Sequence, residues 1–398
     1  MGPIGARAVG GGRVRRRWRA AVRWLHVWLG AAVSLVVLAV GLSGMALAFV
    51  SPLFAWETGA LSPAADGADG PRAPVGVLVD AAVGHFDGAF DPLGILMPGS
   101  RLEVGAAAVY GTPTAASGAQ IGGGAIWLVG VDPGSGEVLG SFDLDATFSH
   151  QLLHFHEDLL LGETGKIVVA VVALLLAGLA VSGVFLWWPA RGRFARQVRR
   201  DVSAVLRRPS QFSLHRTAGV WGGVLVVAWG LSGAYWSKPD WFDPVLSEAW
   251  QDLPAEQRER FAASCGGTVS PTAAERTARR AFPDLSLATM SFAGGGFDHH
   301  RLSLKGPDSL DPYAGDTVLW VHASCPGVFH VRRVGDADAG AQVAHLLPAL
   351  HSGRLFGAAG RPLVLLVGAF TVLAAVTGVV LWYRRYRRRF AAALGRLR

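Results

Sequence analysis

The sequence predicts an α-helical membrane protein: a four-helix transmembrane bundle, made by an internal duplication, with two α+β modules outside the membrane. Of its 398 residues, 51% are hydrophobic, and the mean hydropathy of +0.35 exceeds that of a typical soluble domain. Four apolar runs approach the roughly 20 residues that a membrane-spanning helix needs. The chain also contains one pattern twice, in which a long polar segment lies between two apolar runs.

The predicted spans cover residues 25–50, 166–188, 215–237 and 361–383. Each should be helical, because lipid offers the backbone no hydrogen-bond partners and the chain must supply them itself. The first span follows a basic stretch, as the apolar part of a signal peptide does. It is too long for such a segment, so we expect it to be retained.

Arginines give the predicted orientation. Seven lie in each of three basic segments, 1–24, 189–214 and 384–398, whose single acidic residue is Asp201. Positively charged segments stay in the cytoplasm. Both termini and the link should therefore be cytoplasmic, with residues 51–165 and 238–360 in the periplasm of a bacterial inner membrane. Because the arginines flank membrane helices, we expect them to contact membrane lipid and expect no nucleic-acid binding.

The first outer segment, 51–165, reads as a small α+β module. Its beginning, 51–73, is rich in Pro, Gly, Ala and Asp and predicts an irregular linker. A short helix is expected over Val75–Phe86, and strands over 101–110 and 125–131. Residues 129–139 place two apolar stretches around Pro-Gly-Ser-Gly, which is typical of a hairpin.

The second outer segment, 238–360, repeats this order. An amphipathic helix is expected over Pro271–Phe282, with Thr272 and Glu275 at the spacing of a capping box. Four strand-like stretches follow, at 287–292, 300–304, 317–323 and 328–334. The segment also contains both cysteines of the chain, Cys265 and Cys325, which we expect to form a disulfide in an oxidising compartment.

Matched residues in the two halves support a duplication. Leu25-His26 returns nearly 190 residues later as Leu214-His215, and each is followed by an apolar run that ends in Gly-Leu-Ser-Gly. A shift of 195 aligns the second span with the fourth. It pairs His150 with His345, His156 with His351, Gly162 with Gly357, Gly165 with Gly360, Lys166 with Arg361, Gly183 with Gly378, and Trp187 with Trp382.

Four of the repeated histidines lie where an ionisable ring in a membrane is costly and is typical of a functional site. His26 and His215 lie at the cytoplasmic ends of the first and third spans, and His156 and His351 precede the second and fourth on the outer side. Two bis-histidine b-type haems require this arrangement, in which two helices each supply one histidine ligand at each membrane face. The alternative is that these rings lie in the headgroup zone and contact only lipid or water.

The outer pair has competing candidates. His154 could replace His156 as a ligand, because it lies two residues away, and His345 could compete with or assist His351. At the inner pair, Arg216 could bind a haem propionate. No flavin or nucleotide motif is visible, so the electron donor should be a separate molecule, either quinol or a cytoplasmic flavoprotein.

Four stretches carry a resemblance to a known family. They are Leu25-His26-x-x-x-Gly30, Phe155-His156-Glu157-Asp158-Leu159-Leu160-Leu161-Gly162, Leu214-His215-Arg216-x-x-Gly219 and Leu350-His351-Ser352-Gly353. Over nearly its whole length the chain resembles the PepSY-associated transmembrane-helix proteins, often called iron-regulated membrane proteins. The resemblance implies PepSY-like outer modules and a siderophore reductase. Electrons would pass through haems at His26/His215 and His156/His351 to Fe(III) in a siderophore.

A second hypothesis needs no redox chemistry. The chain would be a membrane-anchored binding or regulatory module, whose PepSY-like domains restrain a periplasmic partner. A permease is disfavoured, because four spans without a charged residue at mid-membrane do not fit a transporter.

Overall fold

The structure is a computed structural model that describes residues 8–59, 72–100, 105–114, 125–189, 192–207, 209–246 and 265–394, except 295–297 and 328, together with residues 253, 257, 259 and 261. The chain divides into two compact units. We call residues 1–48, 154–238 and 361–398 the helical unit, and residues 49–153 and 239–360 the sheet unit.

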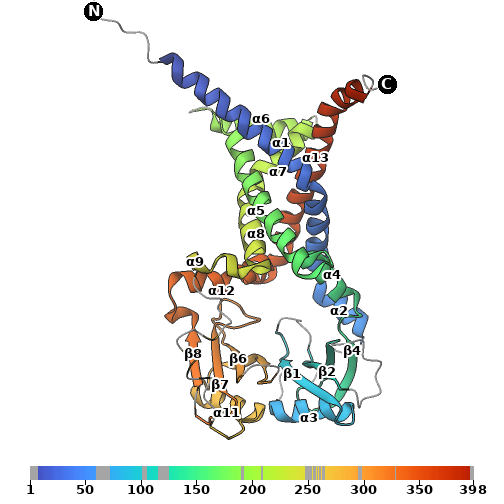
Figure 1. Ribbon diagram of the computed structural model, residues 1–398, viewed down its shortest axis with the longest axis vertical. Helices are drawn as coiled ribbons and strands as arrows, with labels where there is room; N and C mark the ends of the chain where they lie inside the picture. Colours follow the sequence, from blue (N-terminus) through green and yellow to red (C-terminus); the bar gives the residue numbers. More distant parts are fainter. Residues whose placement is uncertain are drawn as a thin grey trace, which may run out of the picture. The chain divides into compact units, whose positions relative to one another are not determined.

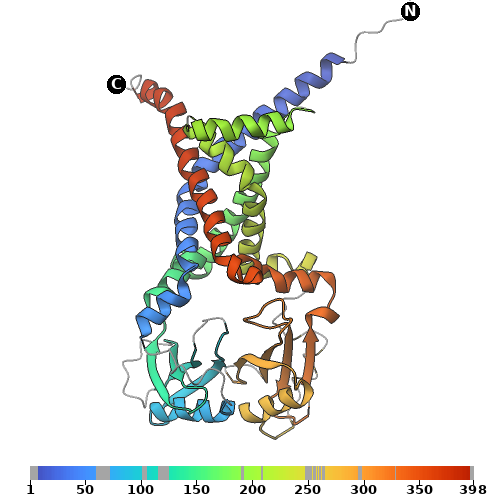
Figure 2. The same cartoon turned by 180° about the vertical axis from the view of Figure 1, so that it is seen from behind.

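Three helices of the helical unit contain segments long and apolar enough to cross a membrane: α1 (Ala8–Leu47), α5 (Gly162–Trp187) and α13 (Gly360–Leu394). A fourth candidate is a bent pair, α7 (Gln211–Trp221) and α8 (Gly223–Ser237). Helix α5 packs against both α1 and α8, and α13 runs alongside them (Figure 1 and Figure 2). The protein is therefore a membrane protein by its helices.

The third predicted span, 215–237, is not one straight helix. The axes of α7 and α8 differ by 64° across Gly222. A Cβ atom at Gly222 would lie 2.7 Å from Cβ of Phe370 on α13, so a residue without a side chain is needed where these helices meet. Glycine also has low helix propensity, which permits a sharp bend at this close approach.

Eight strands among the described residues form one antiparallel sheet in the order β4-β3-β2-β1-β5-β6-β7-β8. They are β1 (Phe90–Leu96), β2 (Ala107–Pro113), β3 (Trp127–Val131), β4 (Val138–Asp143), β5 (Ser286–Ser291), β6 (His299–Lys305), β7 (Thr317–His322) and β8 (Phe329–Arg333). Strands β1 and β5 pair where the halves meet, with Ile95 opposite Met290. The two outer segments are thus halves of one sheet and not two separate modules.

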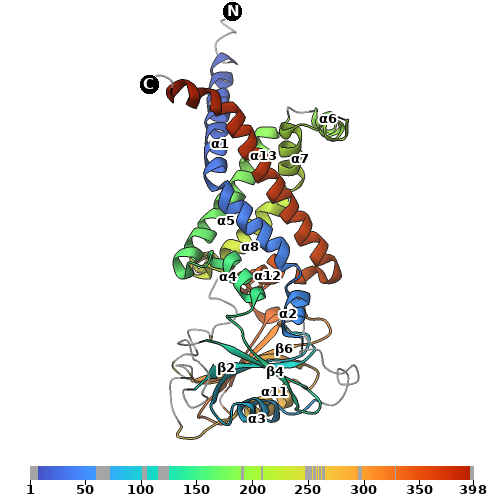
Figure 3. The ribbon, with the colours of Figure 1, turned by 90° about the vertical axis from the view of Figure 1, so that its right-hand side faces the viewer.

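Helices α3 (Val75–His85) and α11 (Pro271–Ala281) cover the same face of the sheet (Figure 3). Their apolar side chains, such as Leu78 and Ala274, are fully buried in one core with residues of both halves. The other described helices are α2 (Val50–Thr58), α4 (Phe148–Asp158), α6 (Phe194–Arg207), α9 (Asp243–Leu246), α12 (Ala339–His351), and the 3₁₀ turns η2 (Pro239–Trp241), η3 (Val334–Asp336) and η4 (Arg354–Ala359).

The predicted capping box at Thr272 and Glu275 is wrong. Ser270 caps α11, because its side chain accepts from the backbone N–H of Ala273 (3.2 Å). The buried carboxylate of Glu275 instead accepts from the backbone N–H of Val75 (2.9 Å). It thereby joins the first turn of α3 to α11.

Other local predictions are confirmed in large part. The short helix, the hairpin and the four strands of the second half are present, and Cys265 is bonded to Cys325. The linker prediction is wrong for its first residues, because 50–58 form α2, with Pro52 in the first helical turn, where proline is tolerated. Residues 60–71 and 101–104, which belong to the predicted linker and first strand, lie outside the described residues.

Candidate functional site

The ring of His26 on α1 and the ring of His215 on α7 lie side by side in the helical unit, in an edge-to-face contact. Their centroids are 6.2 Å apart and their planes are inclined at 77°. Bonds from a metal to imidazole nitrogen are about 2.0–2.1 Å long, so two rings on opposite sides of one iron have centroids roughly 6 Å apart. The sequence-predicted inner pair is therefore brought together at the separation that bis-histidine ligation needs.

Each ring is held through Nδ1 by the second candidate span in its half of the chain, α5 for His26 and α13 for His215. Nδ1 of His215 donates to the carbonyl oxygen of Ala374 on α13 (2.9 Å) and lies 3.2 Å from Oγ1 of Thr377. Nδ1 of His26 lies 2.8 Å from Oγ of Ser182 on α5. Because a carbonyl only accepts, the proton of neutral His215 is on Nδ1 and the lone pair is on Nε2. Metal-binding histidines are oriented in this way by a hydrogen bond from the other nitrogen.

Glycines leave space beside both rings. A Cβ atom at Gly183 would lie 3.3 Å from Cε1 of His26, and one at Gly378 would lie 3.2 Å from Cε1 of His215. Gly30 and Gly219, one helical turn after the two histidines, line the same space. Small residues at these points let a large planar group approach the helix backbones.

A cavity of about 870 Å³ surrounds the two rings. This volume falls in the range of about 300–1,000 Å³ that is typical of cofactor pockets. Besides the histidines and the four glycines, its lining includes apolar residues of α1, α5, α8 and α13 and five arginines: Arg16, Arg19, Arg23, Arg216 and Arg385. Guanidinium groups bind carboxylates well, and haem carries two propionates. The residues present therefore fit a haem, with His26 and His215 as axial ligands.

Asp201 organises the rim of this cavity. It is buried on α6, where its carboxylate pairs with Arg216 (2.5 Å) and accepts from Nε1 of Trp187 (2.6 Å) and Nε2 of Gln197 (3.1 Å). Nε of Arg216 is buried without a hydrogen-bond partner in the described part of the chain. Arg216, which the sequence suggested for a propionate, is thus held by Asp201 with one N–H still unsatisfied.

His156, on α4, repeats the pattern of the inner histidines. The residue is half-buried, and Nδ1 donates to the carbonyl oxygen of Val40 on α1 (3.0 Å) and lies 3.0 Å from Oγ of Ser43. A Cβ atom at Gly44 would lie 2.8 Å from Cε1 of His156. Burial lowers the pKa of His156 to about 4, so the ring is neutral at ordinary pH, as a metal ligand must be.

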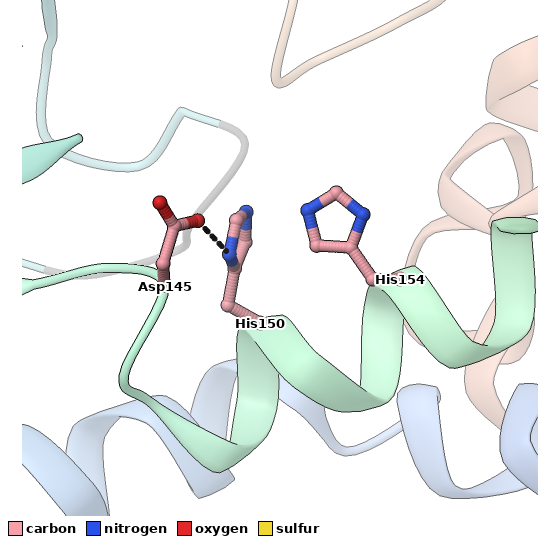
Figure 4. A group of neighbouring side chains, drawn as sticks. All are labelled: Asp145, His150 and His154. Atoms are coloured by element: carbon pink, nitrogen blue, oxygen red, sulfur yellow. Dashed lines mark ion pairs between the residues drawn. The ribbon is translucent and has the colours of Figure 1, made fainter. Parts of the chain in front are cut away.

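His154 does not share this pattern. Its side chain is 42% exposed, and Nδ1 lies 3.2 Å from Oδ2 of Asp158 on the same helix. One turn earlier on α4, Nδ1 of His150 pairs with Oδ1 of Asp145 (3.2 Å), and the His154 ring is turned toward them (Figure 4).

The other two predicted residues belong to the sheet unit. His351 is the last residue of α12, and its pairing with His156 stays a prediction. Nε2 of His345, also on α12, lies 3.0 Å from Oδ1 of Asp316, and its side chain is only 3% exposed. His345 therefore already has a structural partner.

Sequence reasoning missed Ser182, Thr377 and Asp201. Ser182 and Thr377 could have been found, because the shift of 195 that aligns the second and fourth spans also pairs these two hydroxyl residues. Asp201 was visible as the single acid among the arginines, but nothing in the sequence indicates which basic residue it contacts.

These features define a membrane protein with a histidine-paired cavity among its helices. A family model for the PepSY-associated TM region matches residues 23–385, so the chain belongs to the PepSY-associated transmembrane family. No curated protein matches the sequence.

Proposed function

We propose that this protein is a di-haem b oxidoreductase of a bacterial inner membrane that reduces ferric siderophore iron in the periplasm. The neighbouring rings of His26 and His215 carry the proposal, because their centroid separation of 6.2 Å matches that of two axial ligands and both rings line a large cavity. A histidine that lies only in the headgroup zone has no reason to lie beside a second one in a shared cavity. The distribution of arginine supports cytoplasmic termini and a periplasmic sheet unit.

The second haem would be held by His156 and His351, which occupy equivalent positions in the two halves. His156 is favoured over His154, because its Nδ1 is held by a backbone carbonyl group of another helix, as in His215. His154 is half exposed and bonded to Asp158.

Haem bound at these sites supplies reversible one-electron transfer. The chain's own part is to orient the rings of His26, His215 and His156 through Nδ1, and to neutralise propionates with Arg216 and neighbouring arginines. The donor would be quinol or a cytoplasmic protein, and the acceptor a ferric siderophore. Ferrous iron binds hard oxygen ligands more weakly than ferric iron does, so reduction releases it.

The test is single-turnover reduction by the purified full-length protein. The protein is reduced with dithionite, freed of excess reductant without oxygen, and mixed with a ferric hydroxamate or a ferric catecholate siderophore. We expect the haem α band to fall as Fe(II), trapped by ferrozine, appears in equal amount. Protein that shows no haem bands after haem-replete expression would favour the alternative, a PepSY binding or regulatory module. Haem that stays reduced with both siderophores would reject the proposed substrate.

A further inference from the structure

A second group of possible ligands lies on α4, apart from the histidines that fit haem. The ligand atoms of Asp145, His150 and His154 all lie within 4.8 Å of one another. Asp145 comes just before the helix, and the two histidines follow on one helical face, four residues apart (Figure 4). All three side chains come from a stretch of ten residues, so local helix geometry alone brings them together.

We propose that Asp145, His150 and His154 bind one divalent transition-metal ion. Two imidazoles and one carboxylate form a donor set that suits Fe(II), Co(II) and Zn(II). A metal ion with bonds of about 2.0–2.2 Å holds its ligand atoms roughly 3–4 Å apart. Oδ1 of Asp145 and Nδ1 of His150 are already 3.2 Å apart, so small side-chain rotations complete the site.

The second observation is how His154 is held. Its Nδ1 lies 3.2 Å from the carboxylate of Asp158, whose own side chain is only 6% exposed. A carboxylate on one imidazole nitrogen fixes the ring and makes the other nitrogen a better metal ligand. Figure 4 shows the opposite edge of the ring facing His150. Asp158 thus orients His154 toward the cluster.

The duplication shows that this cluster is an addition to the repeated fold. At the shift of 195, Asp145, His154 and Asp158 correspond to Gly340, Ala349 and Gly353, and only His150 has a counterpart, His345. His345 is buried against Asp316. Asp145 and His154 are instead 47% and 42% exposed, which leaves the cluster open to solution. The second half folds without these groups, so they are not needed for the helix itself.

The occupant that fits the proposed function is Fe(II) released by reduction, and this part of the inference rests on that function. Ferrous iron prefers imidazole and carboxylate over the hydroxamate or catecholate oxygens that hold ferric iron. A site on the side of the membrane where reduction is proposed would keep the ion from rebinding to the siderophore.

The test is equilibrium dialysis of purified full-length protein against Co(II), which is not counted as haem iron, with metal analysis of the protein. We expect one Co(II) per chain in wild type. Asp145→Asn should weaken binding at least about tenfold, and His150→Ala combined with His154→Ala should abolish it. His85→Gln is the matched control, because it removes another histidine of the sheet unit outside the cluster, and it should bind as wild type does. Anaerobic Fe(II) dialysis, read with ferrozine, should give the same ranking.

Three results would overturn the proposal: no Co(II) bound by wild type, equal binding by the double variant, or loss of haem bands in His154→Ala, which would make His154 a haem ligand. Failure of the proposed function gives a different pattern. Co(II) would still bind at this cluster in a protein that shows no haem bands, and only the assignment of Fe(II) as occupant would be withdrawn.

Discussion

At the scale of single residues, three histidines follow one rule. His26, His215 and His156 each have Nδ1 bonded to an oxygen of a neighbouring helix and Cε1 against a glycine. The hydrogen bond fixes which nitrogen is available, and the glycine leaves room beside the ring. A larger side chain at such a glycine should therefore remove the haem without removing the ligand.

Gly183→Leu tests this rule at the inner site. Its side chain would occupy space next to Cε1 of His26, so we expect about half of the haem to be lost. Gly178→Leu, on the same helix, is the control, because a Cβ atom there meets nothing within 4 Å. The haem content per chain of the two variants is measured as pyridine haemochrome and compared with that of wild type. Equal content in both variants would contradict the cavity as the haem site.

A second residue-level prediction concerns the buried carboxylate of Asp201. Asp201→Asn removes the charge that pairs with Arg216 and weakens the bond to Trp187. Hydrogen bonds to charged groups contribute about 1.5–3 kcal/mol, so the free energy of unfolding should fall by about that amount. Thermal unfolding of the variant in detergent measures this loss of stability. Arg200→Gln, at an exposed position of the same helix, is the control. An unchanged transition temperature would show that the pair contributes nothing.

The sequence predicted the histidines of the site better than their surroundings. His26, His215 and His156 were found because each recurs at a fixed shift, and repetition separates a functional position from a chance one. Asp201 could not be assigned a partner, because its contacts to Arg216 and Trp187 depend on how α6 packs against α5 and α7. The sequence also did not decide between His154 and His156. Their contacts distinguish them, because Nδ1 of His156 donates to a carbonyl group of α1, whereas Nδ1 of His154 pairs with Asp158 on its own helix.

At the scale of elements, Glu275 shows how a local pattern misleads. Its spacing from Thr272 suggested a cap, whereas its carboxylate binds Val75 at the start of another helix, 200 residues away in sequence. A capping box and a long-range contact place the same residue types at the same spacing, so sequence alone does not distinguish them.

Glu275→Ala should leave the N–H of Val75 buried without an acceptor. Loss of this hydrogen bond costs about 1–3 kcal/mol, and it should destabilise the first turn of α3 most. Hydrogen exchange of the peptide that contains 75–79 should become faster than in wild type. Arg276→Ala, at the next and exposed position of α11, should leave it unchanged. Equal protection in both variants would show that α3 does not depend on this contact.

The disulfide makes a further prediction about the sheet unit. Cys265 and Cys325 are 60 residues apart in sequence, and closing a loop of such length stabilises a fold by about 2–4 kcal/mol. The Cys265→Ser and Cys325→Ser double variant should therefore unfold at lower temperature. Thiol labelling of denatured wild type before reduction should find no free thiol, and two free thiols per chain would contradict the bond.

At the scale of the whole molecule, the duplication explains why the two outer segments fold into two similar halves and join in one sheet. The matched halves predicted two similar outer modules, and most of their strands were placed correctly. Their union was not predicted, because β1 contains Pro92 and Gly94, which hide its strand pattern. This strand pairs with β5 and joins the two halves. An exposed edge strand invites pairing, and here each half covers the edge of the other.

The absorption spectrum of the purified protein, with and without dithionite, tests the central claim most directly. A di-haem protein should show a Soret band and α and β bands that sharpen on reduction, with two haems per chain in wild type and about one in His26→Ala or His215→Ala. The absence of a Soret band after haem-replete expression would contradict this claim, as would full haem content in both histidine variants.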